Sequence, residues 1–234
     1  MTDTFLYLLL LLAVVLSLGA QIKVSSTFHR YSQYRAGSGR TGAEVARRIL
    51  DAHGLFDVKI VEIGGELTDH YDPRARVLRL SRPVSGASTA AAVGVAAHEV
   101  GHAIQHAEGY KPLVIRSKLV PVVTFASRFS WIAIILGILI VGFSSAFSVI
   151  GSYILFGGII LFATTTLFHL VTLPVEVNAS GRALRELELT GFYTKDELKA
   201  SKKVLSAAAM TYIAALAVSV IQLLRLLVLF RRRD

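Results

Sequence analysis

Residues 88–106 read STAAAVGVAAHEVGHAIQH, and this stretch sets the centre of the fold. Alanine is the strongest helix former, so the composition predicts a helix from about Ser88 to His106. Histidine and glutamate are costly to bury in so apolar a helix without a partner. We expect that partner to be a metal ion; the alternative is a polar stripe satisfied by hydrogen bonds or water. Small residues that let the helix pack tightly precede the first histidine: Ala90, Ala91, Ala92, Gly94, Ala96 and Ala97.

The pentapeptide His98-Glu99-Val100-Gly101-His102 matches the H-E-x-x-H pattern. Residues i and i+4 lie on one face of a helix, so both imidazoles can reach one ion while Glu99 projects beside them. Zinc lowers the pKa of water to about 7, and a neighbouring carboxylate can then take the proton. The pattern therefore predicts that His98 and His102 bind zinc and that Glu99 is the general base of a hydrolytic reaction.

Catalytic zinc takes a third protein ligand and keeps its fourth position for water. His106 lies four residues after His102, but three ligands spaced so regularly along one straight helix do not easily converge on one ion. Glu176 is the better candidate. It lies in LPVEVNAS, residues 173–180, where we expect a membrane span to meet water with Pro174 marking the exit. A carboxylate at such a border needs a partner; the alternative is an interfacial, solvated Glu176.

The apolar residues, 53% of the 234, are gathered into three tracts. Residues 4–22 just suffice for one span, and Asp3 as the only preceding charge favours a membrane anchor over a signal peptide. Residues 131–175 carry no Lys, Arg, Asp or Glu over about twice the length of one span. The last span covers roughly Ala207–Phe230, which makes four. The turn between the second and third spans is expected at Ser144, Ser145, Ser148, Gly151 and Ser152.

Cysteine is absent, so disulfides and thiolate ligands are excluded, and any metal site must use His, Asp or Glu. The net charge is +9, but the Lys and Arg residues mostly flank the apolar tracts. That placement is typical of side chains that contact anionic headgroups and set topology. No nucleic-acid motif is recognisable, so we expect the lipid bilayer, and not nucleic acid, as a partner.

Residues 21–128 hold most of the charge that precedes the second span and form the main water-facing region. Thr41 and Glu44 are spaced as a capping box, which predicts a helix over Thr41–His53 that Gly54 closes. Alternating apolar residues predict strands over Asp57–Ile63 and Arg76–Leu80, the second after an Asp72-Pro73 turn.

Four stretches together resemble a known family, the YugP-type neutral zinc metallopeptidases of bacterial membranes. They are TGAEVA at 41–46, LTDHYDPR at 67–74, AAHEVGHAIQ at 96–105 and LPVEVNAS at 173–180, so the similarity spans nearly the whole chain. The resemblance implies a zinc peptidase of the gluzincin kind in the bacterial inner membrane. Its zinc, one per chain, would be bound by His98, His102 and a downstream glutamate, a position that Glu176 matches.

The expected fold is an α+β membrane protein with about four transmembrane helices and a zincin-like α/β metallopeptidase domain at the membrane surface. Residues 4–22 are the first transmembrane helix, and residues 23–128 are the peptidase domain with the H-E-x-x-H helix. Residues 129–173 are a transmembrane hairpin, residues 174–206 a cytoplasmic loop or helix with the third ligand, and residues 207–230 the fourth transmembrane helix.

Two functions of different classes fit these features. The first is an endopeptidase that cleaves membrane or membrane-proximal proteins, with an edge strand, expected at Arg76–Leu80, holding the substrate extended. The second is a non-hydrolytic zinc-binding membrane scaffold or transport component. Only hydrolysis needs a carboxylate between the two histidines, so Glu99 favours the endopeptidase. Intramembrane cleavage is less favoured, because the motif lies about 30 residues before the second span.

A donor near the metal would stabilise the oxyanion of a hydrolytic transition state by roughly 3–4 kcal/mol. His70 and Tyr71 are candidates, since they precede the expected edge strand by a few residues; the alternative is a hydrogen-bonded turn before Pro73.

Basic residues near span ends favour the cytoplasmic side, so we expect the zinc site in the cytoplasm and both termini outside. Only Arg231, Arg232 and Arg233 flank the spans on the other side. Fourteen lie on the side of the motif: Lys23, Arg30, Arg35, Arg40, Lys111, Arg116, Lys118, Arg128, Arg182, Arg185, Lys195, Lys199, Lys202 and Lys203.

Overall fold

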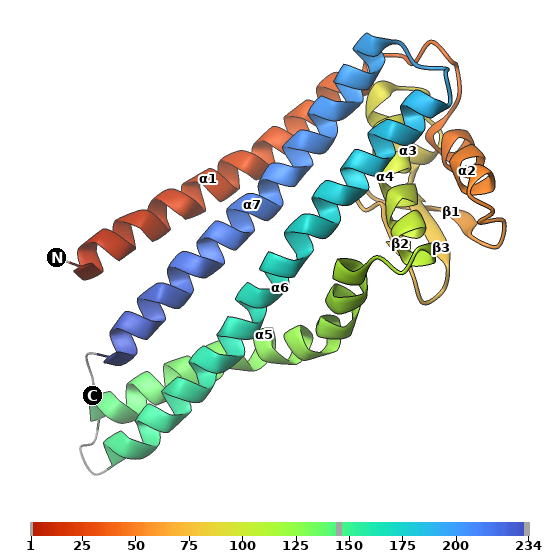
Figure 1. The fold of residues 1–234 in the computed structure, drawn as a ribbon. Helices are drawn as coiled ribbons and strands as arrows, with labels where there is room; N and C mark the ends of the chain where they lie inside the picture. The colour runs from red at the N-terminus through yellow and green to blue at the C-terminus, as the bar shows by residue number, and fades with distance from the viewer. Residues whose placement is uncertain (1, 144–146, 232–234) are drawn as a thin grey trace. The chain divides into compact units, whose positions relative to one another are not determined.

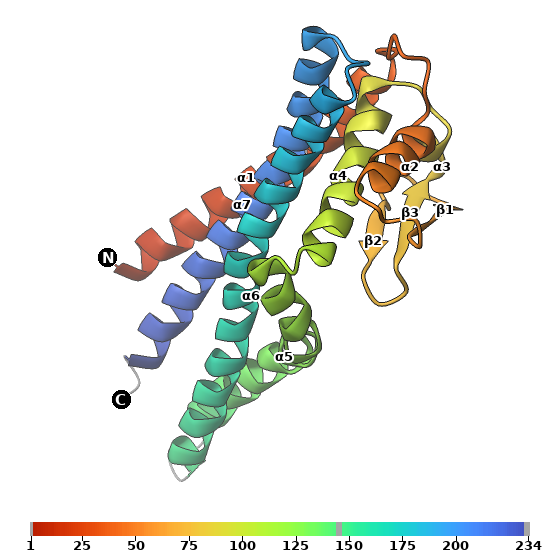
Figure 2. The same cartoon turned by 45° about the vertical axis from the view of Figure 1, so that its right-hand side comes forward.

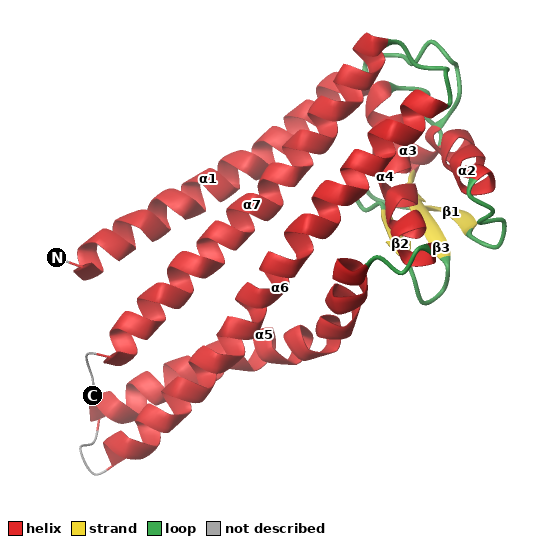
Figure 3. Ribbon diagram, in the orientation of Figure 1, coloured by secondary structure: helices red, strands yellow, loops and turns green. Residues whose placement is uncertain are grey.

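The structure, a computed structural model, describes residues 2–143 and 147–231. It is mostly helical, with one small sheet (Figures 1 and 3). Its elements are, in chain order, α1 (Thr2–Ser32), α2 (Gly42–Ala52), β1 (Lys59–Ile63), β2 (His70–Asp72), β3 (Val77–Ser81), α3 (Arg82–Ser85), α4 (Ala90–Ala107), α5 (Lys111–Phe143), α6 (Ser148–Leu189) and α7 (Lys195–Arg231).

The chain divides into two compact units. The first, which we call the helical unit, consists of residues 1–19, 114–173 and 212–234. The second, the mixed unit, consists of residues 20–113 and 174–211 and contains the sheet together with α2, α3 and α4. The long helices α1, α6 and α7 contribute residues to both units.

Within the described residues, four helices are long and apolar enough to cross a bilayer: α1 from Thr4, α5, α6 and α7. About 20 apolar residues suffice for one crossing, so each helix exceeds the requirement. In the helical unit, α5 and α6 approach closely at Gly137, where an added Cβ would lie 2.5 Å from the backbone nitrogen of Leu155. Small residues at such contacts let transmembrane helices pack backbone to backbone.

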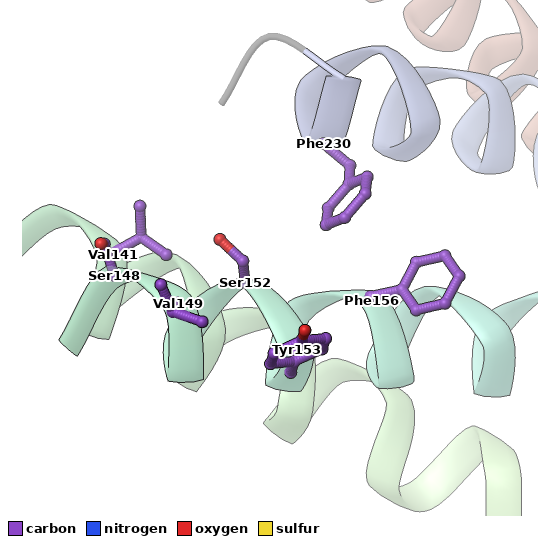
Figure 4. A pocket seen from close by; sticks show the side chains of 7 residues that line it. All are labelled: Val141, Ser148, Val149, Ser152, Tyr153, Phe156 and Phe230. Atoms are coloured by element: carbon purple, nitrogen blue, oxygen red, sulfur yellow. The ribbon is translucent and has the colours of Figure 1, made fainter. Parts of the chain in front are cut away.

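A cavity of about 480 Å³ lies at one end of the helical unit (Figure 4). The rings of Phe156 and Phe230 are in contact there, with centroids 5.3 Å apart. None of its lining residues carries a carboxylate, imidazole or amino group. These residues are Val141, Ser148, Val149, Ser152, Tyr153, Phe156 and Phe230.

The mixed unit is built around α4, which lies beside α2 and beside the sheet (Figure 2). Thr41 caps α2 through the reciprocal bonds of a capping box with Glu44, as the sequence predicts, and Gly54 follows the helix at a φ of +69°. Thr89 caps α4 by accepting a hydrogen bond from the backbone of Ala92. The alanine-rich face of α4 is fully buried against apolar residues of α2 and β3, among them Val45, Leu78 and Leu80.

The sheet has three strands in the order β1-β3-β2. β1 runs parallel to β3, with Lys59 opposite Val77, and β2 runs antiparallel to β3, with His70 opposite Arg79. The expected strands over Asp57–Ile63 and Arg76–Leu80 are therefore present as β1 and β3. The prediction that Arg76–Leu80 is the edge strand is wrong: β3 is central, and the three-residue β2 lies at the edge beside α4.

The exit of the third span also differs from the prediction. Pro174 does not end the helix but lies within α6, which continues for fifteen residues to Leu189. Proline removes only one backbone donor, so a long helix with apolar packing tolerates it. Of the expected turn, Ser144 and Ser145 lie outside the described residues, while Ser148, Gly151 and Ser152 lie in the first turns of α6.

Candidate metal centre

Three side chains of the mixed unit converge on one point: His98 and His102 from α4, and Glu176 from α6. The Oε2 atom of Glu176 lies 3.2 Å from His98 Nε2 and 3.6 Å from His102 Nε2. The two imidazole rings stand edge to face, with centroids 4.8 Å apart. Glu176 is 2% exposed and His102 9%, so the cluster is held away from bulk water. These are the three residues that the sequence predicts to bind zinc.

The geometry fits a zinc ion. Zinc lies about 2.0–2.2 Å from imidazole nitrogen and carboxylate oxygen, which for tetrahedral angles places neighbouring ligand atoms roughly 3.3–3.5 Å apart. The measured separations of 3.2 and 3.6 Å match this spacing, and all three donors lie within 4.8 Å of one another. A donor set of two imidazoles and one carboxylate suits a catalytic zinc, which keeps its fourth position for water.

The other nitrogen of each histidine has a polar partner in the protein. His98 Nδ1 lies 3.1 Å from Ser180 Oγ, on the same helix as Glu176. His102 Nδ1 lies 3.0 Å from Gln105 Oε1, one turn further along α4. Hydrogen bonds at Nδ1 orient the ring and leave Nε2 to face a metal. Both histidines are therefore held with Nε2 toward Glu176.

Glu99 lies on α4 between the two histidines but contacts a different element. Its Oε2 accepts a hydrogen bond from the backbone N–H of Tyr71 in β2 at 3.0 Å. The side chain is buried, and this desolvation raises the pKa of Glu99 to about 7; His98 opposes the shift, and the negative charges of Glu176 and Asp69 add to it. A carboxylate with a pKa near neutrality is suited to accept and release a proton at physiological pH.

The remaining candidate residues, His70, Tyr71 and His106, make different contacts. The hydroxyl of Tyr71 lies 2.9 Å from His106 Nδ1, so both residues contact each other on the β2 side of α4. His106 does not belong to the three-ligand cluster found among the described residues. The exposed side chain of His70 lies 2.9 Å, through Nδ1, from the carbonyl of Thr68. Of the two candidate oxyanion donors, His70 and Tyr71, only Tyr71 has a hydrogen bond to α4 among the described residues.

Close approach of α4 and α6 brings Glu176 to the histidines. A Cβ at Gly101 would lie 2.7 Å from the carbonyl oxygen of Ala179, so no larger residue fits between the two helices without a shift. Gly101 is one of the two variable positions of the H-E-x-x-H pattern, and the pattern itself gives no reason for a glycine there.

Sequence reasoning missed Ser180 and Gln105. Both lie inside the quoted stretches, three or four residues from a ligand, which is one helical turn. Polar residues at that spacing from a metal ligand on a buried helix are the signal that identifies them.

Residues 6–231 of the 234 match the family described as "Putative neutral zinc metallopeptidase". The chain is 50% identical over 219 residues to "Putative membrane protease YugP" of Bacillus subtilis (strain 168), covering 93% of each chain. No solved structure matches. The match over nearly the entire length shows that the chain belongs to this family of neutral zinc metallopeptidases.

Proposed function

We propose that this protein is a membrane-bound zinc metalloendopeptidase that hydrolyses peptide bonds of membrane or membrane-proximal proteins. One observation carries the proposal: a buried glutamate, Glu99, lies between two histidines that share a carboxylate partner, yet it is held by β2 and not by the cluster. Its peptidase domain would be zincin-like, with His98, His102 and Glu176 holding one zinc.

Zinc, when bound, supplies a Lewis acid that lowers the pKa of water to about 7. Glu99 then acts as the general base. Its Oε2 is held by the Tyr71 N–H, and Oε1, which has no hydrogen bond among the described residues, takes the proton of the attacking water. As the water oxygen bonds to the carbonyl carbon and the C–N bond breaks, Glu99 returns that proton to the leaving amine.

The edge strand gives a place for the substrate. β2 pairs with β3 on one side only and lies beside α4, so an extended peptide can add along its open side next to the metal centre. The strand that does this is β2, in place of the predicted Arg76–Leu80. A peptide bound in this way would pass close to Glu99, because Tyr71 of β2 already contacts that side chain.

The alternative, a zinc-binding scaffold or transport component, explains the three ligands but not Glu99. Burying a carboxylate that binds no metal costs free energy, and its single backbone hydrogen bond only partly offsets that cost. A scaffold would be more stable with glutamine at this position. The buried, proton-accepting Glu99 therefore favours hydrolysis.

The test is a pair of variants that separate metal binding from chemistry. Glu99→Gln keeps all three ligands, so the purified protein should retain about one zinc per chain and lose at least about 100-fold in cleavage of an unfolded model protein. His98→Ala should lose both zinc and cleavage. Membranes of cells that make wild-type or Glu99→Gln protein should differ in the abundance of substrates. Equal cleavage by wild type and Glu99→Gln would rule out this mechanism.

A further inference from the structure

We propose that Gln105 is a positioning residue, which holds His102 in the one tautomer whose Nε2 lone pair faces Glu176. The inference rests on the metal centre described above. It concerns a residue that binds neither zinc nor substrate and acts through His102.

Gln105 is completely buried on α4, one turn beyond His102. Both ends of its amide are engaged. Oε1 lies 3.0 Å from His102 Nδ1, and Nε2 donates to the carbonyl oxygen of Val175 at 2.9 Å and to Asn178 Oδ1 at 2.8 Å. Val175 immediately precedes Glu176, so one amide contacts one ligand directly and the backbone beside another.

The partners decide which end of the amide faces His102. The carbonyl of Val175 can only accept a hydrogen bond. Asn178 has an amide that could turn, but Arg182 Nε donates to its Oδ1 at 2.8 Å, and a guanidinium has no acceptor atom. Arg182 is itself held by Glu108 at 2.7 Å. Gln105 must therefore direct its NH₂ group to α6 and its carbonyl oxygen to His102.

This orientation determines the tautomer. An acceptor oxygen at 3.0 Å requires that His102 Nδ1 carries the proton, and a neutral imidazole then has its lone pair on Nε2. That nitrogen faces Glu176 Oε2 at 3.6 Å. His98 is held differently, because its Nδ1 partner is the Ser180 hydroxyl, which can donate or accept. Of these two Nδ1 partners, that of His102 requires a proton on Nδ1 and that of His98 does not.

Without Gln105, His102 would distribute between two tautomers, and zinc binding would have to select one of them. The variant that tests this is Gln105→Met, which keeps the length of the side chain and removes both hydrogen-bonding groups. Loss of such an outer partner weakens metal binding by about 10–100-fold. Gln105→Glu keeps an oxygen acceptor against Nδ1 and should bind zinc more tightly than Gln105→Met. Ser180→Ala, which removes the partner of His98 and leaves Gln105 in place, is the matched control for the tautomer of His102.

Three measurements on the full-length protein in detergent test the role, and none needs turnover. Competition with a chromophoric chelator gives the zinc Kd, which should rise by about 10–100-fold in Gln105→Met. The second measurement is the ¹⁵N spectrum of histidine-labelled, metal-free protein, in which the His102 signal is identified because it is missing from His102→Gln. This signal should show a protonated Nδ1 in wild type and in Ser180→Ala. It should show mixed tautomers in Gln105→Met. The visible spectrum of the Co²⁺ form should change in Gln105→Met.

Unchanged zinc affinity and an unchanged His102 signal in Gln105→Met would overturn the proposal. A lower melting temperature of the metal-free protein with His102 still protonated at Nδ1 would also overturn it, because Gln105 would then serve only packing. A different result would contradict the proposed function. If zinc-loaded wild type showed no cleavage that depends on Glu99, hydrolysis would be rejected, but the tautomer measurements would still test the role of Gln105.

Discussion

Glu99 and Glu176 are both buried, and their different contacts are the basis for the different roles that we propose for them. Glu176 Oε2 lies within 3.6 Å of both imidazoles, where we propose that it binds the metal, whereas Glu99 is held by the backbone of β2. Glu176→Gln removes the ligand charge and should weaken zinc binding at least about 10-fold. His106→Ala, which removes the partner of Tyr71, should leave zinc affinity nearly unchanged. Zinc titrations of both variants measure these affinities. Weak binding in His106→Ala together with normal binding in Glu176→Gln would show that His106 is the third ligand.

The raised pKa of Glu99 predicts how the stability of the zinc-free protein depends on pH. Its pKa is about 7 in the folded state against an ordinary value of 4.5, so between these pH values the folded protein binds one more proton than the unfolded chain. Stability due to this group is therefore present below pH 4.5 and is lost as the pH rises to about 7.

The loss amounts to about 3 kcal/mol, because one pKa unit corresponds to about 1.4 kcal/mol. Glu99→Gln does not ionise and should not show it. Unfolding of the two zinc-free proteins in detergent at pH 5 and pH 8 tests this: the advantage of Glu99→Gln should grow with pH. Parallel pH profiles would contradict the assignment.

The three residues that come together could be predicted from the sequence, because His98 and His102 follow from local spacing and Glu176 from its place at the end of an apolar tract. Gln105 and Ser180 were missed although each lies one helical turn from a candidate ligand. The bonds of Gln105 to Val175 and Asn178, and of Ser180 to His98, depend on how α4 and α6 pack against each other. The roles of His70 and Tyr71 remain predictions.

Tyr71 gives the clearest test of the oxyanion prediction. Burial raises the pKa of its hydroxyl, so this group stays protonated and able to donate. Tyr71→Phe keeps the backbone contact to Glu99 and should lower kcat by roughly 100-fold at normal zinc content if the hydroxyl is the donor. His70→Ala is the comparison variant, since His70 is exposed and bonded to Thr68. Normal turnover in both variants would leave only the alternative, a hydrogen-bonded turn before Pro73.

At the scale of elements, the contact between α4 and α6 at Gly101 controls the distance between the ligands. Gly101→Ala would place a methyl group 2.7 Å from the carbonyl oxygen of Ala179, so α6 must move and carry Glu176 with it. We expect the zinc Kd of Gly101→Ala to rise at least about 10-fold. Gly181→Ala on α6 is the matched control, because nothing lies within 4 Å of its added Cβ; it should gain up to about 1 kcal/mol of helix stability. Equal zinc affinities of Gly101→Ala and Gly181→Ala would show that the position of α6 does not determine zinc binding.

Some of the helices and strands could be predicted from local sequence patterns alone. The capping box of α2 and the strands β1 and β3 follow from residue type and alternation, and all are present. β2 was not predicted, because three residues are too few for an alternating pattern, and its place at the edge depends on pairing with β3. Asp69 stabilises that pairing by accepting hydrogen bonds from the backbone and hydroxyl of Ser81, a contact across twelve residues.

At the scale of the whole molecule, hydropathy was the most informative feature. It predicted four spans, and four helices of sufficient length and apolarity are present. It did not predict that the helices extend past the apolar tracts into the mixed unit, as α6 does beyond Pro174. The polar ends of these helices are amphipathic, so packing within the mixed unit, and not hydropathy, decides where they stop.

Orientation is the remaining prediction. Two helices that are long and apolar enough to cross the bilayer, α5 and α6, separate His102 from Glu176, so two crossings would place both residues on the same side, as a shared metal centre requires. Fourteen Lys and Arg residues flank the spans on that side, against Arg231, Arg232 and Arg233 on the other. Basic residues near span ends are retained in the cytoplasm, so the zinc centre is expected there.

A reporter that is active only in the cytoplasm tests this directly. Inserted near Lys195, in the segment that joins α6 to α7, it should be active; fused after Asp234, it should be silent. Replacing the three C-terminal arginines with glutamine should leave both results unchanged, because the larger group of basic residues sets the orientation. The reverse pattern would place the centre outside, where its substrates would be exported proteins and not cytoplasmic segments of membrane proteins.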